Sequence, residues 1–136
     1  MLVVSHSVLL EAAPERVWRK LVDWKDWPSW DTGQEKIEFD GPINAGSVGK
    51  LKLKGGPEVA LKIVDFSPGK SYVSEFKLLG ARFVFGHSIV SKAKNLTVLT
   101  VVVEMKGLSA LLWAGLMCAS LRKDVPQWMQ NFKSTL

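Results

Sequence analysis

The sequence has little of what secreted, metal-binding and membrane-spanning proteins need. It contains one cysteine, Cys118, in 136 residues, so it forms neither an internal disulfide nor a cysteine-based zinc site. Its two histidines, His6 and His87, lie far apart and have no carboxylate at helical ligand spacing, so we expect no metal. No stretch reaches the roughly 18 uncharged apolar residues of a membrane span, and the first residues do not resemble a signal peptide. We therefore expect a cytoplasmic protein without a transmembrane segment.

Charge and loop composition also exclude several partners. There are 18 basic and 13 acidic residues, a net charge of +5, and the surplus is spread along the chain rather than clustered as in nucleic-acid-binding proteins. Lys50, Lys52 and Lys54 alternate with leucines, which favours one solvated strand face over a basic docking surface. No glycine-rich loop leads into a helix and no Gly-x-Ser-x-Gly elbow occurs, so we expect no cofactor and no serine nucleophile.

The patterns that are present predict a single domain over residues 1–136. Apolar residues make up 47% of the chain, enough for one core. A strand over Leu2–Leu10 leads into an amphipathic helix from Pro14 to near Asp23, and tight turns follow at the tryptophan-rich segment 24–30. Short alternating runs then predict six more strands, namely Glu35–Phe39, Ser47–Lys54, Glu58–Phe66, Ser71–Leu78, Arg82–Val90 and Leu96–Met105.

After Gly107 the apolar period becomes helical to the end of the chain, with Pro126 inside the helix and a turn expected at 121–124. The order predicts an α+β fold in which a curved, seven-stranded antiparallel sheet is covered by one long C-terminal helix, with short helices between the first two strands.

Several segments, in this order, resemble the polyketide cyclase/dehydrase group of the START and birch-pollen-allergen (SRPBCC) superfamily. They are Ala13–Trp18, Leu21–Asp23, Trp27–Trp30, Ile63–Lys70, Gly86–Ser88, Met105–Leu108 and Pro126–Lys133. The resemblance implies the helix-grip fold, with an elongated apolar cavity between the sheet and the last helix. Members bind lipids, sterols, polyketides or plant hormones, and a minority catalyse cyclisation, dehydration or hydroxylation.

Strand alternation predicts which side chains face such a cavity. The more apolar parity of the strands, together with one face of the last helix, gives the candidate ligand-binding residues Leu51, Leu53, Leu61, Ile63, Tyr72, Ser74, Phe76, Phe83, Phe85, His87, Leu99, Val101, Val103, Leu112, Leu116 and Ala119. Ile37, Phe39, Val59 and Ile89 share the same parity.

His87 and Tyr72 are the residues of this set best suited to chemistry. His87 lies between Phe85 and Ile89, where it could titrate near neutrality and act on a ligand carbonyl, or simply be a hydrogen-bonded core histidine. Tyr72 could donate to the same ligand or to water at the cavity wall. If the protein is an enzyme, these two residues are the expected catalytic pair; otherwise it has none.

The favoured function is a binding or carrier protein for a small hydrophobic or amphipathic ligand of lipid, polyketide or aromatic type. The first alternative is a cyclase or dehydratase, and the second is a protein-partner module that uses the tryptophan turns or the last helix. Leu108–Ala119 is apolar on every face, which favours a homodimer contact over a membrane-surface contact or a cavity lid.

Overall fold

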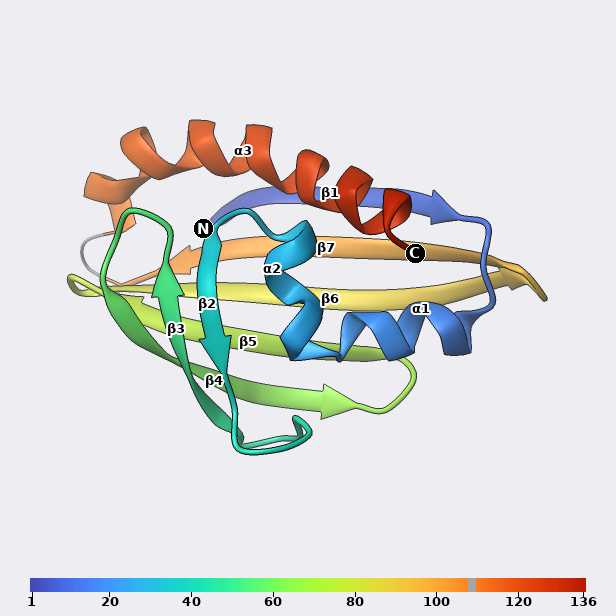
Figure 1. Cartoon of the computed structure of the whole chain (residues 1–136). Coiled ribbons are helices and arrows are strands. Elements are labelled where there is room, and N and C mark those ends of the chain that lie inside the picture. The colour runs from blue at the N-terminus through green and yellow to red at the C-terminus, as the bar shows by residue number, and fades with distance from the viewer. Residues whose placement is uncertain (108–109) are drawn as a thin grey trace.

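The structure is a computed structural model that describes the backbone of residues 1–107 and 110–136, and the side chains of residues 1–107 and 118–136. Its helices and strands follow the predicted order (Figure 1). The elements are β1 (Leu2–Leu10), α1 (Pro14–Leu21), the short 3-10 turn η1 (Trp24–Asp26), α2 (Trp27–Trp30), β2 (Gln34–Glu38), β3 (Val48–Leu53), β4 (Glu58–Ser67), β5 (Ser71–Leu78), β6 (Ala81–Ala93), β7 (Leu96–Lys106) and α3 (Ala110–Ser134).

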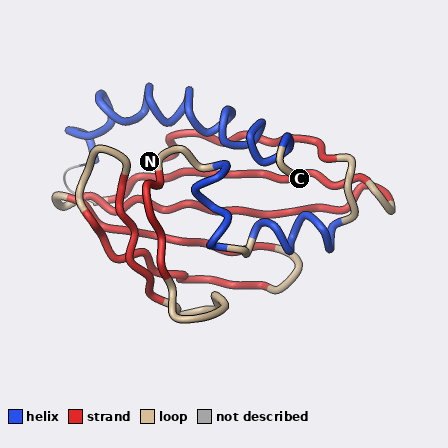
Figure 2. Tube along the Cα trace, in the orientation of Figure 1, coloured by secondary structure: helices blue, strands red, loops and turns tan. Residues whose placement is uncertain are grey.

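The seven strands form one antiparallel sheet with the order β1-β7-β6-β5-β4-β3-β2. Consecutive strands from β2 to β7 are neighbours, as in a meander, and β1 closes the far edge against β7. The sheet curves, and the three α-helices lie on the same side of it, with α3 running along its length (Figures 1 and 2). The predicted fold class is therefore confirmed.

The strand boundaries follow the predicted runs closely, and the largest difference lies at the end of β6. This strand continues to Ala93, three residues beyond the predicted Val90, because Ala93 still pairs with Leu96 before a two-residue turn. The three added residues, Ser91, Lys92 and Ala93, are all exposed, so they show no alternation of burial. Backbone pairing, rather than side-chain burial, determines where this hairpin ends.

The C-terminal helix differs from the prediction at its proline. The expected turn over 121–124 is wrong, since α3 runs without interruption from Ala110 to Ser134 with Pro126 inside it. On either side of the proline, Val125, Met129 and Phe132 are fully buried against the sheet. Their burial compensates for the one backbone hydrogen bond that proline removes.

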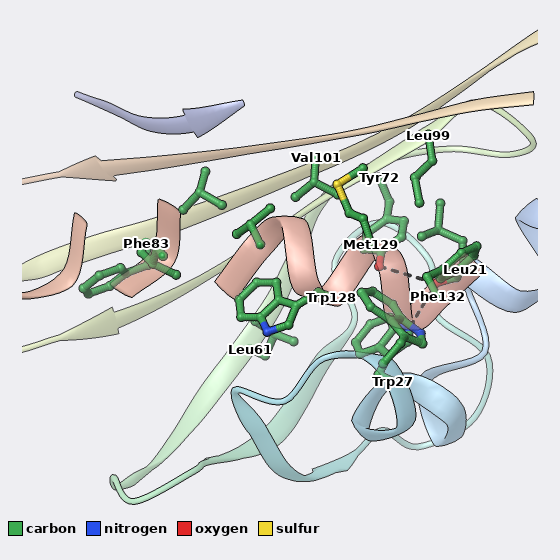
Figure 3. Close-up of a cluster of buried hydrophobic side chains, with 14 of the residues drawn as sticks. Leu21, Trp27, Leu61, Tyr72, Phe83, Leu99, Val101, Trp128, Met129 and Phe132 are labelled. Atoms are coloured by element: carbon green, nitrogen blue, oxygen red, sulfur yellow. Dashed lines mark hydrogen bonds between the residues drawn. The ribbon is translucent and has the colours of Figure 1, made fainter. Parts of the chain in front are cut away.

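Part of the core lies beneath the C-terminal half of α3. Figure 3 shows Met129 and Phe132 from this helix beside Leu21 and Leu99, and all four side chains are almost completely buried. Three hydrogen bonds fix the helices to this framework: Thr97 Oγ1 to the Ala12 carbonyl (2.8 Å), Arg122 Nε to the Val3 carbonyl (3.0 Å) and Asn131 Nδ2 to the Trp30 carbonyl (3.3 Å). The bonds at Thr97 and Val3 lie at opposite ends of the β1–β7 pair, so the helices are anchored at both ends of the sheet.

Within the described residues, no helix is both long and apolar enough to cross a membrane. Most of the predicted self-association segment, Leu108–Ala119, lies outside the residues whose side chains the structure describes. Of its described members, Cys118 is buried and Ala119 is exposed.

Candidate functional site

A cavity of about 460 Å³ lies between the concave side of the sheet, α2 and α3. Its walls are mainly apolar and aromatic, with Leu61, Phe76 and Phe83 from the sheet. Exposed lining residues come from the β3–β4 turn, at Gly55, and from α3, at Ser120. The cavity therefore opens between this turn and the last helix.

Nine of the residues predicted from alternation line this cavity. They are Leu51, Leu53, Leu61, Tyr72, Ser74, Phe76, Phe83, Phe85 and His87. Ile63, Leu99, Val101 and Val103 face the same side of the sheet but are buried in the core and do not line the cavity. Figure 3 places Leu99 and Val101 near Met129 of α3, so this part of the sheet is filled by the helix.

The prediction for Ala119 is wrong, because its side chain is exposed and the neighbouring helical positions line the cavity instead. Leu121, Asp124 and Trp128 recur at three- and four-residue spacing and form that wall. The side chains of Leu112 and Leu116 lie outside the described residues.

An aromatic stack forms the inner wall of the cavity. The Tyr72 ring lies between the rings of Trp27 (5.8 Å, 8° between planes) and His87 (4.4 Å, 17°). Trp27 Nε1 donates to the Leu21 carbonyl at 2.8 Å, and the Tyr72 hydroxyl donates to the same oxygen at 3.4 Å (Figure 3). The stack thus satisfies a carbonyl at the end of α1 that has no partner within the helix.

His87 is buried, and its burial works against the predicted role in proton transfer. Burial lowers its pKa from 6.5 to about 4, although hydrogen bonds with the backbone of Tyr72 and Phe85 raise the pKa and partly oppose this shift. The expectation that it titrates near neutrality is therefore wrong. At neutral pH the ring is uncharged, and Nδ1 has no hydrogen-bond partner.

Tyr72→Phe is expected to lower the free energy of unfolding by less than about 1 kcal/mol, since it removes one long hydrogen bond and keeps the stacked ring. The affinity for an apolar ligand should stay unchanged, because the hydroxyl is directed at the Leu21 carbonyl. Urea unfolding and ligand titration measure the two quantities. A large loss of affinity would show that this hydroxyl contacts the ligand.

Asp31, which was not predicted from the sequence, is a buried carboxylic acid of the cavity with a strongly raised pKa. It follows α2 directly, is only 9% exposed, and accepts hydrogen bonds from Gly33 N and Gln34 Nε2, both at 2.9 Å. Burial raises its pKa from 3.8 to about 7; the two hydrogen bonds oppose this shift and the Asp124 carboxylate adds to it. Asp31 therefore changes its charge near neutral pH, as general acids and bases do.

Unsatisfied polar atoms concentrate around the same cavity. In the described part of the chain, three buried side-chain nitrogen or oxygen atoms lack a hydrogen-bond partner, namely Trp30 Nε1, Gln34 Oε1 and His87 Nδ1. All three residues line the cavity. Such atoms cost free energy unless a ligand or water satisfies them, so this clustering is typical of a binding site.

A second hollow of about 640 Å³ lies between α1 and the β4–β5 turn. Its lining includes the exposed Glu15, Arg19 and Lys70, and it contains no titratable residue that is buried. Among the described residues, no group of three or more His, Cys, Asp or Glu side chains is arranged to hold a metal ion. The first cavity is therefore the candidate site.

Comparison with solved structures confirms the fold. A START superfamily protein from Mycobacterium smegmatis has a TM-score of 0.73 and 15% identity, with 97% of each chain covered. Norcoclaurine synthase from Thalictrum flavum, solved with dopamine and hydroxybenzaldehyde, has a TM-score of 0.60 and 16% identity, with 85% of this chain and 82% of that chain covered. At these identities the similarity shows the fold alone.

A protein of the dynemicin biosynthetic locus gives a TM-score of 0.72 at 17% identity over 96% of this chain, which spans only 45% of that longer chain. No curated protein sequence matches this chain significantly. The family model described as polyketide cyclase/dehydrase and lipid transport matches residues 1–136. The chain therefore belongs to the polyketide cyclase/dehydrase and lipid transport family.

Proposed function

We propose that this protein binds or carries a small amphipathic ligand in the cavity between the sheet and α3. The observation that carries the proposal is a cavity of about 460 Å³ with an apolar wall at Phe76 and Phe83 and a polar end at Asp31 and Asp124. Ligand sites typically have about 300–1,000 Å³ and combine an apolar lining with few polar groups. The three unsatisfied polar atoms beside it supply further hydrogen-bonding capacity.

Catalysis is the second candidate function, and Asp31 is the observation that favours it. A carboxyl with a pKa of about 7 can accept or donate a proton at neutral pH. The pair first predicted is less suited to this, since His87 is uncharged at neutral pH and the Tyr72 hydroxyl is directed at Leu21. A cyclase or dehydratase would thus use Asp31, with His87 as a hydrogen-bonding partner of the substrate.

Native mass spectrometry of protein purified from its own host separates these functions. A carrier retains a small molecule that is recovered unchanged after incubation, whereas an enzyme converts it. Protein that holds no small molecule and binds none would favour the protein-partner alternative. A homodimer through Leu108–Ala119 and a cytoplasmic location stay predictions. The mass of the intact protein in the same measurement distinguishes a monomer from a dimer.

Ser74→Phe is expected to weaken binding of the apolar dye N-phenylnaphthylamine by at least about tenfold. Ser74 is buried on β5 and lines the cavity, so a phenyl ring there occupies space that the dye needs. The matched control is Val73→Phe, at the neighbouring β5 position whose side chain points to the opposite face of the sheet. Dye fluorescence measures the affinity, and equal binding by both variants would place the dye outside the cavity.

A further inference from the structure

The polar end of the cavity has more hydrogen-bond acceptors than donors. Each Asp31 carboxyl oxygen accepts one hydrogen bond from the protein, and Asp124 accepts one from Ser120 Oγ at 3.2 Å. An ionised carboxylate can accept about four, so both acids retain free capacity. Among the described residues, Gln34 Oε1 adds a buried acceptor with no donor, and Trp30 Nε1 is a buried donor with no acceptor. A ligand that complements this end therefore supplies several N–H or O–H donors.

The protein does not neutralise these two acids itself. In the described part of the chain the ion pairs join Lys20 to Asp26, Lys52 to Glu35 and Arg82 to Glu75. Neither Asp31 nor Asp124 takes part in one. Lys54 also lines the cavity, but its side chain is exposed at the mouth. Two acids with no cationic partner therefore face a partly closed space, although the chain as a whole carries a net charge of +5.

Indole rings surround the same space. Trp27 and Trp30 from α2 and Trp128 from α3 line the cavity together with the two acids. Trp128 Nε1 is engaged with Thr32 Oγ1 at 3.1 Å, which holds its ring in place. Indole faces attract cations through their quadrupole, and the attraction grows where water is excluded. Carboxylates combined with tryptophan rings are suited to an ammonium group.

We propose that the cavity selects an amphipathic ligand with a cationic amino group, which lies between Asp31 and Asp124 while the apolar part extends toward Phe76 and Phe83. The proposal rests on the ligand-binding function proposed above and specifies the class of ligand. Three N–H donors of a primary ammonium match the free acceptors of Asp31, Asp124 and Gln34. The charge of the ligand replaces the missing protein cation.

Binding of such a ligand should depend on pH. The titratable side chains that line the cavity in the described residues are Asp31, Lys54, Tyr72, His87 and Asp124. Asp31, whose pKa is about 7, is expected to change its charge between about pH 5.5 and pH 8.5. An ammonium ligand favours the ionised form of Asp31. The affinity for this ligand should therefore rise with pH, and its binding should release the Asp31 proton near neutral pH.

The test uses three probes that share a decyl chain and differ only at the head: n-decylammonium, n-decanol and n-decanoate. An alkylammonium with a pKa of about 10 keeps its charge at both pH values. Isothermal titration at about pH 8.5 should show n-decylammonium binding at least about tenfold more tightly than n-decanol, with n-decanoate weakest. The preference should shrink at about pH 5.5. Repeating the titration near neutral pH in buffers of different ionisation enthalpy measures the released proton.

Variants assign the preference to the two acids. Asp31→Asn and Asp124→Asn should each reduce the preference for n-decylammonium over n-decanol. The control Asp40→Asn changes an exposed acid that does not line the cavity and should keep the wild-type preference. If n-decanol or n-decanoate binds the wild type as tightly as n-decylammonium, this inference is overturned and the ligand-binding function stands. If none of the three binds, the proposed function fails as well.

Discussion

Asp31→Asn is expected to stabilise the protein at about pH 8 by roughly 3 kcal/mol. The pKa of Asp31 is raised from 3.8 to about 7, so the folded state holds this proton more tightly than the unfolded state. The free energy of unfolding therefore falls as pH rises from about 4 to about 7, by an amount on the order of 4 kcal/mol. Asparagine carries no charge and avoids this cost, although it accepts hydrogen bonds through one oxygen only, which costs about 1 kcal/mol.

Urea unfolding of both proteins at about pH 4 and about pH 8 measures this effect. The gain should nearly vanish at the lower pH, where the folded state is protonated at Asp31 and the unfolded state is close to half protonated, so little of the pH-dependent cost remains. Asp40→Asn, at an exposed acid, should change stability little at either pH. A variant that is destabilised equally at both values would show that the hydrogen bonds to Gly33 and Gln34 outweigh the buried charge.

His87 and Asp31 influence stability in opposite directions with pH. Burial lowers the pKa of His87 to about 4, so its contribution to stability is lost as pH falls from about 6.5 to about 4. Between about pH 4 and pH 7, therefore, His87 is neutral and Asp31 is mostly protonated. Above this range Asp31 carries a charge that the protein leaves without a cationic partner. The cost in stability at physiological pH is what a ligand-binding group, rather than a structural one, is expected to show.

The sequence predicts the fold well because alternation and helical period report directly on burial. β1 and β5 begin and end at the predicted residues. β1 is a β-rich run without a helical period that ends before Pro14, and β5 alternates between the turn residues Gly69 and Gly80. The same pattern selects Phe83 and His87 for the cavity wall. Strand alternation predicts which face of the sheet a side chain lies on. It does not predict along which part of each strand α3 packs directly against the sheet and leaves no cavity. Leu99 and Val101 consequently belong to the core rather than the site.

The place of Asp31 and Asp124 in the cavity wall could not be predicted from alternation, for a different reason. Asp31 lies in a turn after a one-turn helix, where no period predicts burial, and an acid in a turn is usually exposed. Asp124 lies on α3. The apolar stretch that precedes it in the sequence predicts a buried face of the helix that includes Ala119. The structure shows Leu121 inward and Ala119 exposed. The usable signal was the apolar series Leu121, Val125 and Trp128, which fixes the buried face of this half of α3.

Trp27→Ala is expected to lower the free energy of unfolding by about 3–5 kcal/mol. Trp27 is 2% exposed, stacks on Tyr72 and meets Phe39 edge-on. Its truncation leaves a void beside the cavity and removes the 2.8 Å hydrogen bond to the Leu21 carbonyl. Since domains of this size are stable by about 5–15 kcal/mol, the variant would be marginal. Trp27→Phe, which retains a ring, should lose only part of this energy.

Trp24→Ala is the matched comparison, three residues earlier in the same tryptophan-rich segment. Trp24 is only half-buried, and its Nε1 donates to the Gly41 carbonyl at an exposed position, at 2.9 Å. Truncation there leaves a space that solvent can fill, so the loss should be less than half of that at Trp27. Urea unfolding of the three variants measures the losses. Equal, small losses at both positions would mean that the two indoles do not pack as core side chains, and would favour the alternative in which the tryptophan turns form a partner surface.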